Sequence, residues 1–585
     1  MTFPTIRAAV RAATFLLPWA IVAGCSMTDA EERSHRGQTQ EAEGDIGRGW
    51  SPASLTEVKR IPITTLRSAV QQRLAGKQPG TIGDEAWRHT KRLYARFEQS
   101  PLWFEKGGLD KDRAEALTKA LLNATRDGLR IDDYPLSDLA RAVTTVRETK
   151  QPTAEQLADA DVLLTAAYVS LGEDLLVGQV DPRTVGQSWH IDTRDENVDS
   201  ALARTIVKQP LDKAINAMRP NDEEYVALQK DLEHFRELVG KGGWKAIPAG
   251  KALKRGQSES PERIAALRAR LEAEGISVPA ASPSSASATT PSKKGASAPR
   301  STAAVPGAVF DDGLASAVAQ FQARHGINVD STLGKETVNA LNVPAEYRLG
   351  QIAANLERHR WLPRSLGTRY IYVNVPAFQL QAFDKGEPVL QSKVIVGQEY
   401  EDKATPVFSD SMETVVFRPY WNITPDIQAK EIEPKLASDP GYLAENDMEY
   451  YNDGGQRRIR QRPGPKNSLG YVKFLFPNDF NIYLHDTPNH ELFDKDVRAF
   501  SHGCIRVEKP VELAQWVLGW DASRVEQAMR EGGDNRGVKL PQKIPVYITY
   551  GTAYVRDGQL YFGNDLYHRD DELVKAMAEG AVVSP

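Results

Sequence analysis

Cys504 is one of two cysteines in the 585-residue sequence, and it stands close to two histidines. His502 lies two positions before Cys504, and His485 lies 19 positions before it. The thiolate is the reactive form of cysteine, and an imidazole within reach can accept the thiol proton. These residue types at this spacing predict a nucleophile at Cys504 with a histidine as its base.

The elements around these residues must bring them together. Residues two apart in a strand share a face, so a strand at 504–507 that extends back to His502 would point His502 and Cys504 the same way. His485 ends a separate apolar run, 481–485. If this run forms a strand next to that of Cys504, it could present His485 to the cysteine. Gly503 permits a close backbone approach, as an oxyanion site built from peptide N–H groups requires.

The region from Tyr370 onward has the pattern of a mostly β domain, because short apolar or alternating runs are separated by turn residues. The expected strands are 370–375, 378–383, 389–396, 414–417, 481–485, 504–507, 546–550 and 559–562. One helix is expected at 510–518. Residues 425–475 are polar and rich in Pro and Gly, which predicts a lid or binding loop, with a surface insertion as the alternative. Tyr420 and Trp421 precede this segment and either line the pocket or pack in the core.

The region before the β domain divides into two helical units. Residues 56–235 predict a helical scaffold, with a capping box at Thr153 and Gln156. Residues 240–345 predict a smaller unit whose first helix begins after Ser260 with Pro261 in its first turn. Residues 280–309 are almost entirely Ala, Ser, Pro, Thr and Lys and predict a disordered insertion, because they cannot bury enough apolar surface.

The N-terminus predicts a targeting segment. Arg7 and Arg11 precede an apolar run that ends at Cys25, and the run is too short to span a bilayer. The residues before Cys25 resemble the lipobox of bacterial lipoproteins. That resemblance implies a signal peptide at 1–25, lipidation of Cys25 and a flexible tether at 26–55. A plain signal peptide with a chance cysteine is the alternative. The implied location is the periplasmic face of the envelope, and Ser26 favours the outer membrane.

The composition sets further limits. The formal net charge is −5 at pH 7, which gives no electrostatic case for a nucleic-acid partner. No internal stretch approaches the roughly 20 apolar residues of a membrane span. We expect no disulfide between Cys25 and Cys504, since each has a chemistry of its own.

His485 followed by Ser501-His502-Gly503-Cys504 and Arg506 resembles the signature of the L,D-transpeptidase (YkuD-type) catalytic domain. Residues 261–341 resemble a three-helix peptidoglycan-binding module, with departures at the insertion and at Ser331, where that family usually has Gly. Together the three parts resemble the large, YcbB-like L,D-transpeptidases. The resemblance implies an α+β multidomain protein with a mostly β catalytic domain at 350–570.

The resemblance also implies residue roles. Cys504 attacks a tetrapeptide stem, expels D-Ala and forms a thioester, which a second stem resolves to give a 3-3 cross-link. His485 is the general base, and His502 and Gly503 shape the site, with the N–H groups of Gly503 and Cys504 as oxyanion donors. The candidate substrate-binding residues are Ser501, Arg506, Tyr420 and Trp421. No cofactor or metal is implied, and the expected partners are peptidoglycan and, through the lipid, a membrane.

Several alternatives remain open from sequence. Water could resolve the thioester and make the enzyme an L,D-carboxypeptidase, or a protein lysine could resolve it and anchor a wall protein. A zinc peptidase or amidase could use His485, His490, His502 and Cys504, but their spacing matches no common zinc motif. A non-catalytic lipoprotein that tethers peptidoglycan is the third class.

Overall fold

The structure is a computed structural model that describes residues 55–186, 188–191, 197–208, 210–279, 309–399 and 403–579. The predicted signal peptide with Cys25, nearly all of the predicted tether and most of the predicted insertion at 280–309 lie outside these residues. No helix in the described ranges has both the length and the apolar character needed to cross a membrane.

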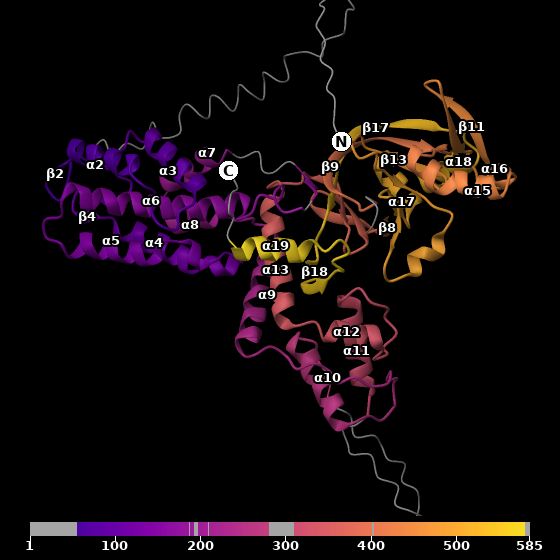
Figure 1. Ribbon diagram of the computed structural model, residues 1–585, viewed down its shortest axis with the longest axis horizontal. Coiled ribbons are helices and arrows are strands. Elements are labelled where there is room, and N and C mark those ends of the chain that lie inside the picture. The colour runs from indigo at the N-terminus through magenta and orange to yellow at the C-terminus, as the bar shows by residue number, and fades with distance from the viewer. Residues whose placement is uncertain are drawn as a thin grey trace, which may run out of the picture. The chain divides into compact units, whose positions relative to one another are not determined.

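The N-terminal region is helical, as predicted, and is organised around the long helix α6 (Ala154–Val177), which Figure 1 shows in purple. Most of α6 is buried, because helices α2, α3, α4 and α5 pack around it. The predicted capping box is confirmed: the Thr153 hydroxyl accepts from Gln156 N–H, and the Gln156 side chain accepts from Thr153 N–H. The other helices are α2 (Ile63–Ala75), α3 (Asp84–Arg96), α4 (Lys111–Leu122), α5 (Leu136–Glu148), α7 (Val198–Ile206), α8 (Leu211–Asn216) and α9 (Glu223–Gly240).

Short elements complete this region. Helix α4 ends at Leu122, and the 3-10 turn η1 (Ala124–Asp127) that follows is capped by Gly128 in the left-handed conformation. A second 3-10 turn is η2 (Ile131–Asp133), and two small hairpins pair β1 (Glu57–Val58) with β2 (Ile61–Pro62) and β3 (Phe104–Glu105) with β4 (Gly108–Leu109).

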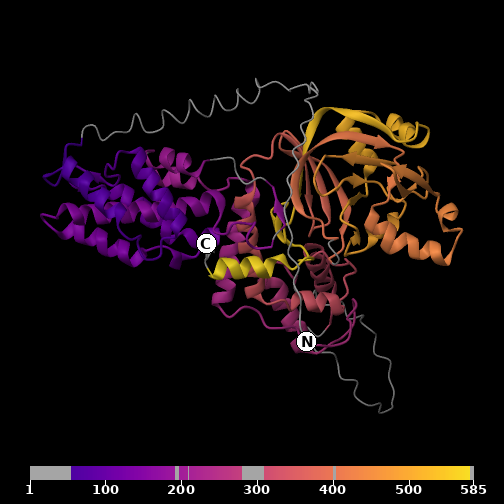
Figure 2. The ribbon, with the colours of Figure 1, turned by 45° about the horizontal axis from the view of Figure 1, so that its top comes forward.

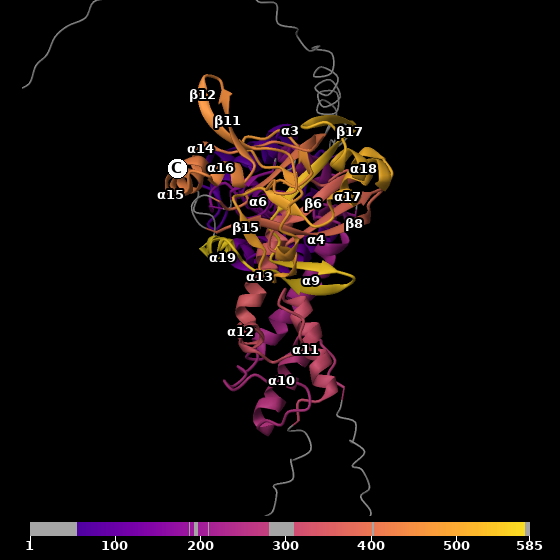
Figure 3. The same ribbon diagram turned by 90° about the vertical axis from the view of Figure 1, so that its right-hand side faces the viewer.

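The small helical module consists of α10 (Pro261–Ala273), α11 (Asp312–Arg324) and α12 (Lys335–Leu341), which Figure 3 shows together. Leu267, Leu271 and Phe321 are buried in its own core. The predicted N-cap is confirmed, since the Ser260 hydroxyl accepts from Arg263 N–H. Ser331 adopts a φ of 58°, a left-handed conformation that Gly takes more readily, which explains the usual Gly at this position of the module.

The C-terminal domain is built on a sheet whose strands close into a ring. The strand order is β13-β14-β16-β8-β7-β6-β17-β9, and β9 pairs again with β13. Figure 2 shows these strands side by side in orange and yellow. The ring strands are β6 (Arg369–Asn374), β7 (Gln379–Asp384), β8 (Glu387–Gly397), β9 (Val407–Phe417), β13 (Val472–Leu475), β14 (Leu484–His485), β16 (Ile505–Val507) and β17 (Arg536–Thr549). Two short strands, β5 (Trp189–His190) and β15 (Ala499–Ser501), pair with β9 and β8.

Helices cover the ring and complete its core. These are α13 (Ala345–Trp361), α17 (Pro510–Leu518), α18 (Ala522–Arg530) and α19 (Arg569–Glu579), together with the 3-10 turn η4 (His490–Asp494). Leu513, Val525 and Leu573 extend from these helices into the apolar core of the ring. A hairpin of β18 (Ala553–Arg556) and β19 (Gln559–Phe562) precedes α19.

The segment between β9 and β13 is an ordered subdomain, which we call the insertion (residues 418–471). It contains a three-stranded sheet of β10 (Trp421–Asn422), β12 (Gln456–Gln461) and β11 (Met448–Asp453), and Figure 3 shows β11 and β12 as a hairpin. Its helices are α14 (Pro425–Ile427), the π-helical turn η3 (Gln428–Ile432), α15 (Glu433–Ser438) and α16 (Tyr442–Glu445). Ile423, Ile432, Met448 and Ile459 form its own apolar core, so the insertion is more than a loop.

Candidate active site

Three neighbouring strands bring the chemically important side chains together. Lys473 of β13 lies opposite His485 of β14, and His485 in turn lies beside Arg506 of β16. Cys504 immediately precedes β16, and the N–H of Ile505 donates to the carbonyl of Tyr483 at 3.1 Å. The parallel ladder therefore places Cys504 next to Tyr483, two residues along the strands from the row of Lys473, His485 and Arg506.

The Cys504 thiol is half-buried at the end of this ladder. Its Sγ donates to the carbonyl of Asn481 at 3.7 Å. Burial raises the pKa of the Cys504 thiol, while hydrogen bonds from Tyr483 and the charges of Lys473 and Arg506 act in the opposite direction. The resting sulfur is therefore a neutral thiol, and nearby positive charge favours the thiolate when the proton leaves.

His485 is buried, with 4% of its surface exposed. Its Nδ1 lies 2.5 Å from the carbonyl oxygen of Asp486, and a carbonyl can only accept, so the proton resides on Nδ1. The other nitrogen, Nε2, is then free to act as a base. Burial, and next the charge of Arg506, lower the pKa of His485 to about 3. The imidazole is therefore neutral at rest and able to accept a proton.

The loop from Ser501 to Cys504 is held by its own hydrogen bonds. The Ser501 hydroxyl donates to the Cys504 carbonyl at 2.5 Å and accepts the N–H of Gly503 at 3.2 Å. Gly503 has a φ of 112°, which few other residues adopt, and its carbonyl accepts from the Thr405 hydroxyl at 2.9 Å. The expectation of two oxyanion donors is therefore corrected, because the Gly503 N–H is already engaged. The Cys504 N–H has no hydrogen-bond partner in the part of the chain that the structure describes.

Residues 502–504 lie between β15 and β16 and belong to neither strand, which corrects the expectation of one strand through His502 and Cys504. The His502 ring instead pairs with Glu431 of the insertion, and Lys403 Nζ lies 3.6 Å from the same carboxylate. Burial alone would raise the pKa of Glu431, but these positive partners outweigh it and lower that pKa.

Tyr420 and Trp421 belong to the base of the insertion. The Arg460 guanidinium lies 4.1 Å from the centre of the Tyr420 ring, and Trp421 packs against the apolar core of the insertion. Both residues thus have packing partners within the insertion.

Sequence reasoning missed Lys473, Tyr483, Thr405 and Glu431. Lys473 carried a usable signal, since it interrupts the buried residues Val472 and Phe474 of an alternating strand. Burial lowers the pKa of its ammonium group, and its Nζ lies 5.6 Å from the centre of the Tyr483 ring. The contributions of Thr405 and Glu431 depend on contacts across 98 and 71 positions of sequence, which no local pattern indicates.

The zinc alternative requires donors that converge. In the described ranges, the group of His, Cys, Asp and Glu close enough to hold a metal ion is Glu85, His89 and Glu173 in the helical region. The histidines near Cys504 are instead directed to protein partners, His485 to a carbonyl and His502 to Glu431. Among the residues that the structure describes, the side chains around Cys504 therefore do not converge as metal ligands would.

Comparison with protein families identifies this domain. Residues 368–548, which contain the three strands described above, match the family model "L,D-transpeptidase catalytic domain". Residues 368–548 are an L,D-transpeptidase catalytic domain. The chain also matches "Scaffold domain" at 88–232 and "Putative peptidoglycan binding domain" at 298–341, so it combines the L,D-transpeptidase domain with a peptidoglycan-binding domain in one large chain.

Individual proteins are similar as well. A protein of Haemophilus influenzae named "Putative L,D-transpeptidase" is 31% identical over 243 residues, which are 38% of this chain. The match spans 48% of that relative, about half its length. The L,D-transpeptidase (residues 123–326) of Xylanimonas cellulosilytica is 15% identical, covering 52% of this chain and 99% of that chain with a TM-score of 0.15. The Ldtfm-avibactam carbamoyl enzyme is 13% identical, covering 32% and 51% with a TM-score of 0.16. Such low TM-scores add nothing to the assignment of the fold.

Proposed function

We propose that this chain is a peptidoglycan L,D-transpeptidase that forms 3-3 cross-links through a thioester at Cys504. The observation that carries the proposal is a half-buried thiol directly before β16 and a neutral, oriented imidazole on the paired strand β14, with Lys473 and Arg506 on the same three neighbouring strands. An acyl-transfer enzyme needs these parts: a nucleophile, a base whose free nitrogen is available, and positive charge where negative charge develops.

The first half-reaction forms the acyl-enzyme. His485 Nε2 accepts the thiol proton while Sγ attacks the carbonyl carbon of the bond between the third residue and the terminal D-Ala of a tetrapeptide stem. The Cys504 N–H donates to the oxyanion of the tetrahedral intermediate. The carbon–nitrogen bond then breaks, the imidazolium returns its proton to the leaving amine, and D-Ala departs. The product is a thioester on Cys504.

The second half-reaction repeats these steps with a new nucleophile. The side-chain amine of the third residue of an acceptor stem attacks the thioester carbon and loses a proton to His485. The carbon–sulfur bond breaks, and the sulfur is protonated again as a thiol. An amide between two third residues is formed, which is the 3-3 cross-link. Asp486 contributes by holding the imidazole in one tautomer, and Ser501 and Thr405 contribute by fixing the Cys504 loop.

The location belongs to the same proposal. A signal peptide at 1–25 with lipidation of Cys25 would anchor the enzyme to a membrane at the periplasmic face of the envelope, with the outer membrane favoured by Ser26. The peptidoglycan-binding domain supports the same compartment, because its ligand lies there.

The test uses residues 26–585 and the variants Cys504→Ala and His485→Ala, each mixed with a disaccharide-tetrapeptide and followed by mass spectrometry. We expect a cross-linked dimer with loss of D-Ala, absent with Cys504→Ala and reduced by about 10²–10⁴ with His485→Ala. Tripeptide without dimer would make the enzyme a carboxypeptidase with the same centre. A muropeptide joined by an amide to a protein lysine, with loss of D-Ala, would favour wall-protein anchoring. Neither product nor protein adduct, with bound muropeptide detected, would favour the tether and refute the proposal.

A further inference from the structure

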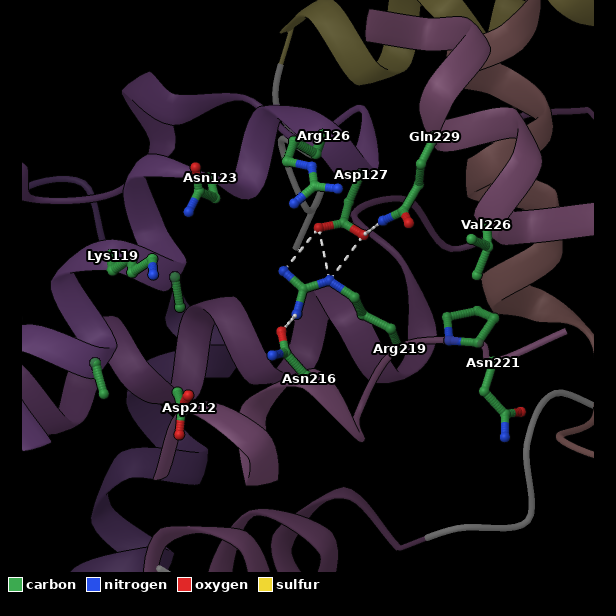
Figure 4. A pocket seen from close by; sticks show the side chains of 13 residues that line it. Lys119, Asn123, Arg126, Asp127, Asp212, Asn216, Arg219, Asn221, Val226 and Gln229 are labelled. Atoms are coloured by element: carbon green, nitrogen blue, oxygen red, sulfur yellow. Dashed lines mark hydrogen bonds and ion pairs between the residues drawn. The ribbon is translucent and has the colours of Figure 1, made fainter. Parts of the chain in front are cut away.

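A polar pocket in the helical region has no part in the chemistry at Cys504. It lies among α4, η1, α8 and α9 and has a volume of about 450 Å³. Cavities of about 300–1,000 Å³ are typical of sites for small ligands. Figure 4 shows Lys119, Asn123 and Arg126 along one side, Asn221 and Val226 on another, and the pair of Asp127 and Arg219 between them.

The floor of the pocket is fixed and electrically balanced. The Asp127 side chain is fully buried, and its carboxylate accepts from Arg219 at 2.9–3.0 Å, from the Tyr225 hydroxyl at 2.9 Å and from the Gln229 amide at 2.7 Å. Arg219 also donates to the side chain of Asn216 at 2.8 Å. Arg219 thus neutralises the charge of Asp127 within the floor, and these hydrogen bonds hold the side chains of the floor in one arrangement.

The rim carries charge that the protein does not neutralise. Neither Lys119 nor Arg126 has a hydrogen bond or ion pair from its side chain in the described residues, and both are exposed. With Asp127 paired to Arg219, the other carboxylate of the lining is the exposed Asp212. The pocket therefore presents more positive than negative charge to a ligand, which favours an anion with carboxylates.

The other residues that line the pocket favour two further kinds of chemical group in a ligand. The amides of Asn123 and Asn221 can each donate and accept, which suits peptide or N-acetyl groups. Ala116, Ala120 and Val226 supply small apolar patches, which suit methyl groups. An alanine-containing, acidic peptide carries carboxylates, amides and methyl groups and therefore suits this lining.

We infer that this pocket binds the stem peptide of a peptidoglycan strand, with Lys119 and Arg126 on its carboxylates. This inference rests on the proposed function for the choice of peptidoglycan over other acidic peptides. It gives the scaffold domain a ligand of its own: the pocket holds a strand, and the chemistry takes place at Cys504.

The test measures hydrogen exchange in the Cys504→Ala protein, which binds without turnover, with and without a disaccharide-tetrapeptide. We expect protection of residues 116–127 and 212–229, lost or weakened at least tenfold in titrations of the Lys119→Ala/Arg126→Ala double variant. The matched control is Arg141→Ala/Lys150→Ala, which removes two exposed cations outside the pocket and should retain full protection. An uncharged N-acetylglucosamine oligomer should protect these segments far less.

Other results would overturn the inference: no protection in the parent, equal protection in the double variant, equal loss in the control, or equal protection by the uncharged oligomer. With Cys504 intact, the double variant should keep its turnover of soluble tetrapeptide within about twofold, because the pocket lies outside the catalytic domain. Protection without any turnover would refute the proposed function and leave the pocket as a binding site. Turnover without protection would refute the pocket as a binding site and leave the proposed function intact.

Discussion

Arg506 lies directly beside His485 in the parallel ladder between β14 and β16, and its charge helps to keep the imidazole neutral. This relationship predicts the pH dependence of the Arg506→Gln variant. Removing a neighbouring cation makes protonation of His485 easier, so its pKa rises from about 3 toward the ordinary value of about 6.5. The acid limb of kcat/KM should therefore move to higher pH in rate measurements between pH 4 and 8. Arg506→Lys, which keeps the charge, should show a much smaller shift, and an unchanged acid limb in Arg506→Gln would refute this role.

Ser501 determines the shape of the loop that carries Cys504. Its hydroxyl joins the Gly503 N–H to the Cys504 carbonyl, and it is almost fully buried. Ser501→Ala leaves both backbone groups without this partner, which costs about 1–3 kcal/mol for a buried polar group. We expect kcat/KM to fall by about 10–100-fold and the free energy of unfolding to fall by about 1–3 kcal/mol. Ser523→Ala, at an exposed serine of α18, serves as the control and should keep normal activity. Wild-type rates in Ser501→Ala would contradict the assignment.

Glu431 of the insertion contacts the loop from Ser501 to Cys504 through the side chain of His502. The two side chains are about one-third exposed, so their pairing should contribute about 0.2–1 kcal/mol. Glu431→Gln is therefore expected to raise KM by about 1.5–5-fold and to leave kcat within twofold. The effect should shrink in high salt, because salt screens an exposed pair. Glu445→Gln, at an exposed glutamate of the same insertion, should leave KM unchanged. A fall in kcat alone would instead give His502 a direct part in the chemistry.

Asp161 stabilises the helical scaffold from inside α6. Burial raises the pKa of this carboxyl to about 6, although it accepts from the Tyr94 hydroxyl and from the N–H groups of Leu102 and Trp103. Asp161→Ala leaves these donors buried and unsatisfied, so we expect a loss of about 2–4 kcal/mol in the free energy of unfolding. Chemical denaturation of the two proteins measures the loss. The exposed neighbour Asp159, changed to Ala, should cost less than about 1 kcal/mol, and equal losses would rule out the buried carboxylate as the cause.

Local features of the fold could be predicted from sequence because the residues that determine them are close in the chain. Thr153 and Gln156 are three positions apart, and Ser260 with Pro261 starts a helix as expected. The strand at 559–562 also begins and ends where the alternation predicts. The candidate active centre was inferred in a different way: the sequence around Cys504 resembles a known signature, and that resemblance implies a role for His485.

Contacts between distant segments could not be predicted. The row of Lys473, His485 and Arg506 depends on the register of three strands, and register is set by the whole ring. The strand expected at 481–485 is reduced to Leu484 and His485, because Asn481 adopts a φ of 56° and ends the extended conformation. The engagement of Gly503 N–H by Ser501 depends on a turn that a strand pattern does not indicate.

The two ends of the insertion meet within the ring. Phe417, the last residue of β9, lies opposite Val472, the first residue of β13, and Arg418 N–H donates to the carbonyl of Tyr471 at 2.8 Å. Because the chain leaves and returns at the same point, the intervening segment can lengthen, shorten or be exchanged while the ring keeps its pairing. The insertion, which contacts the loop before Cys504 through Glu431 and His502, can thus change in evolution independently of the strands that carry Lys473, His485 and Arg506.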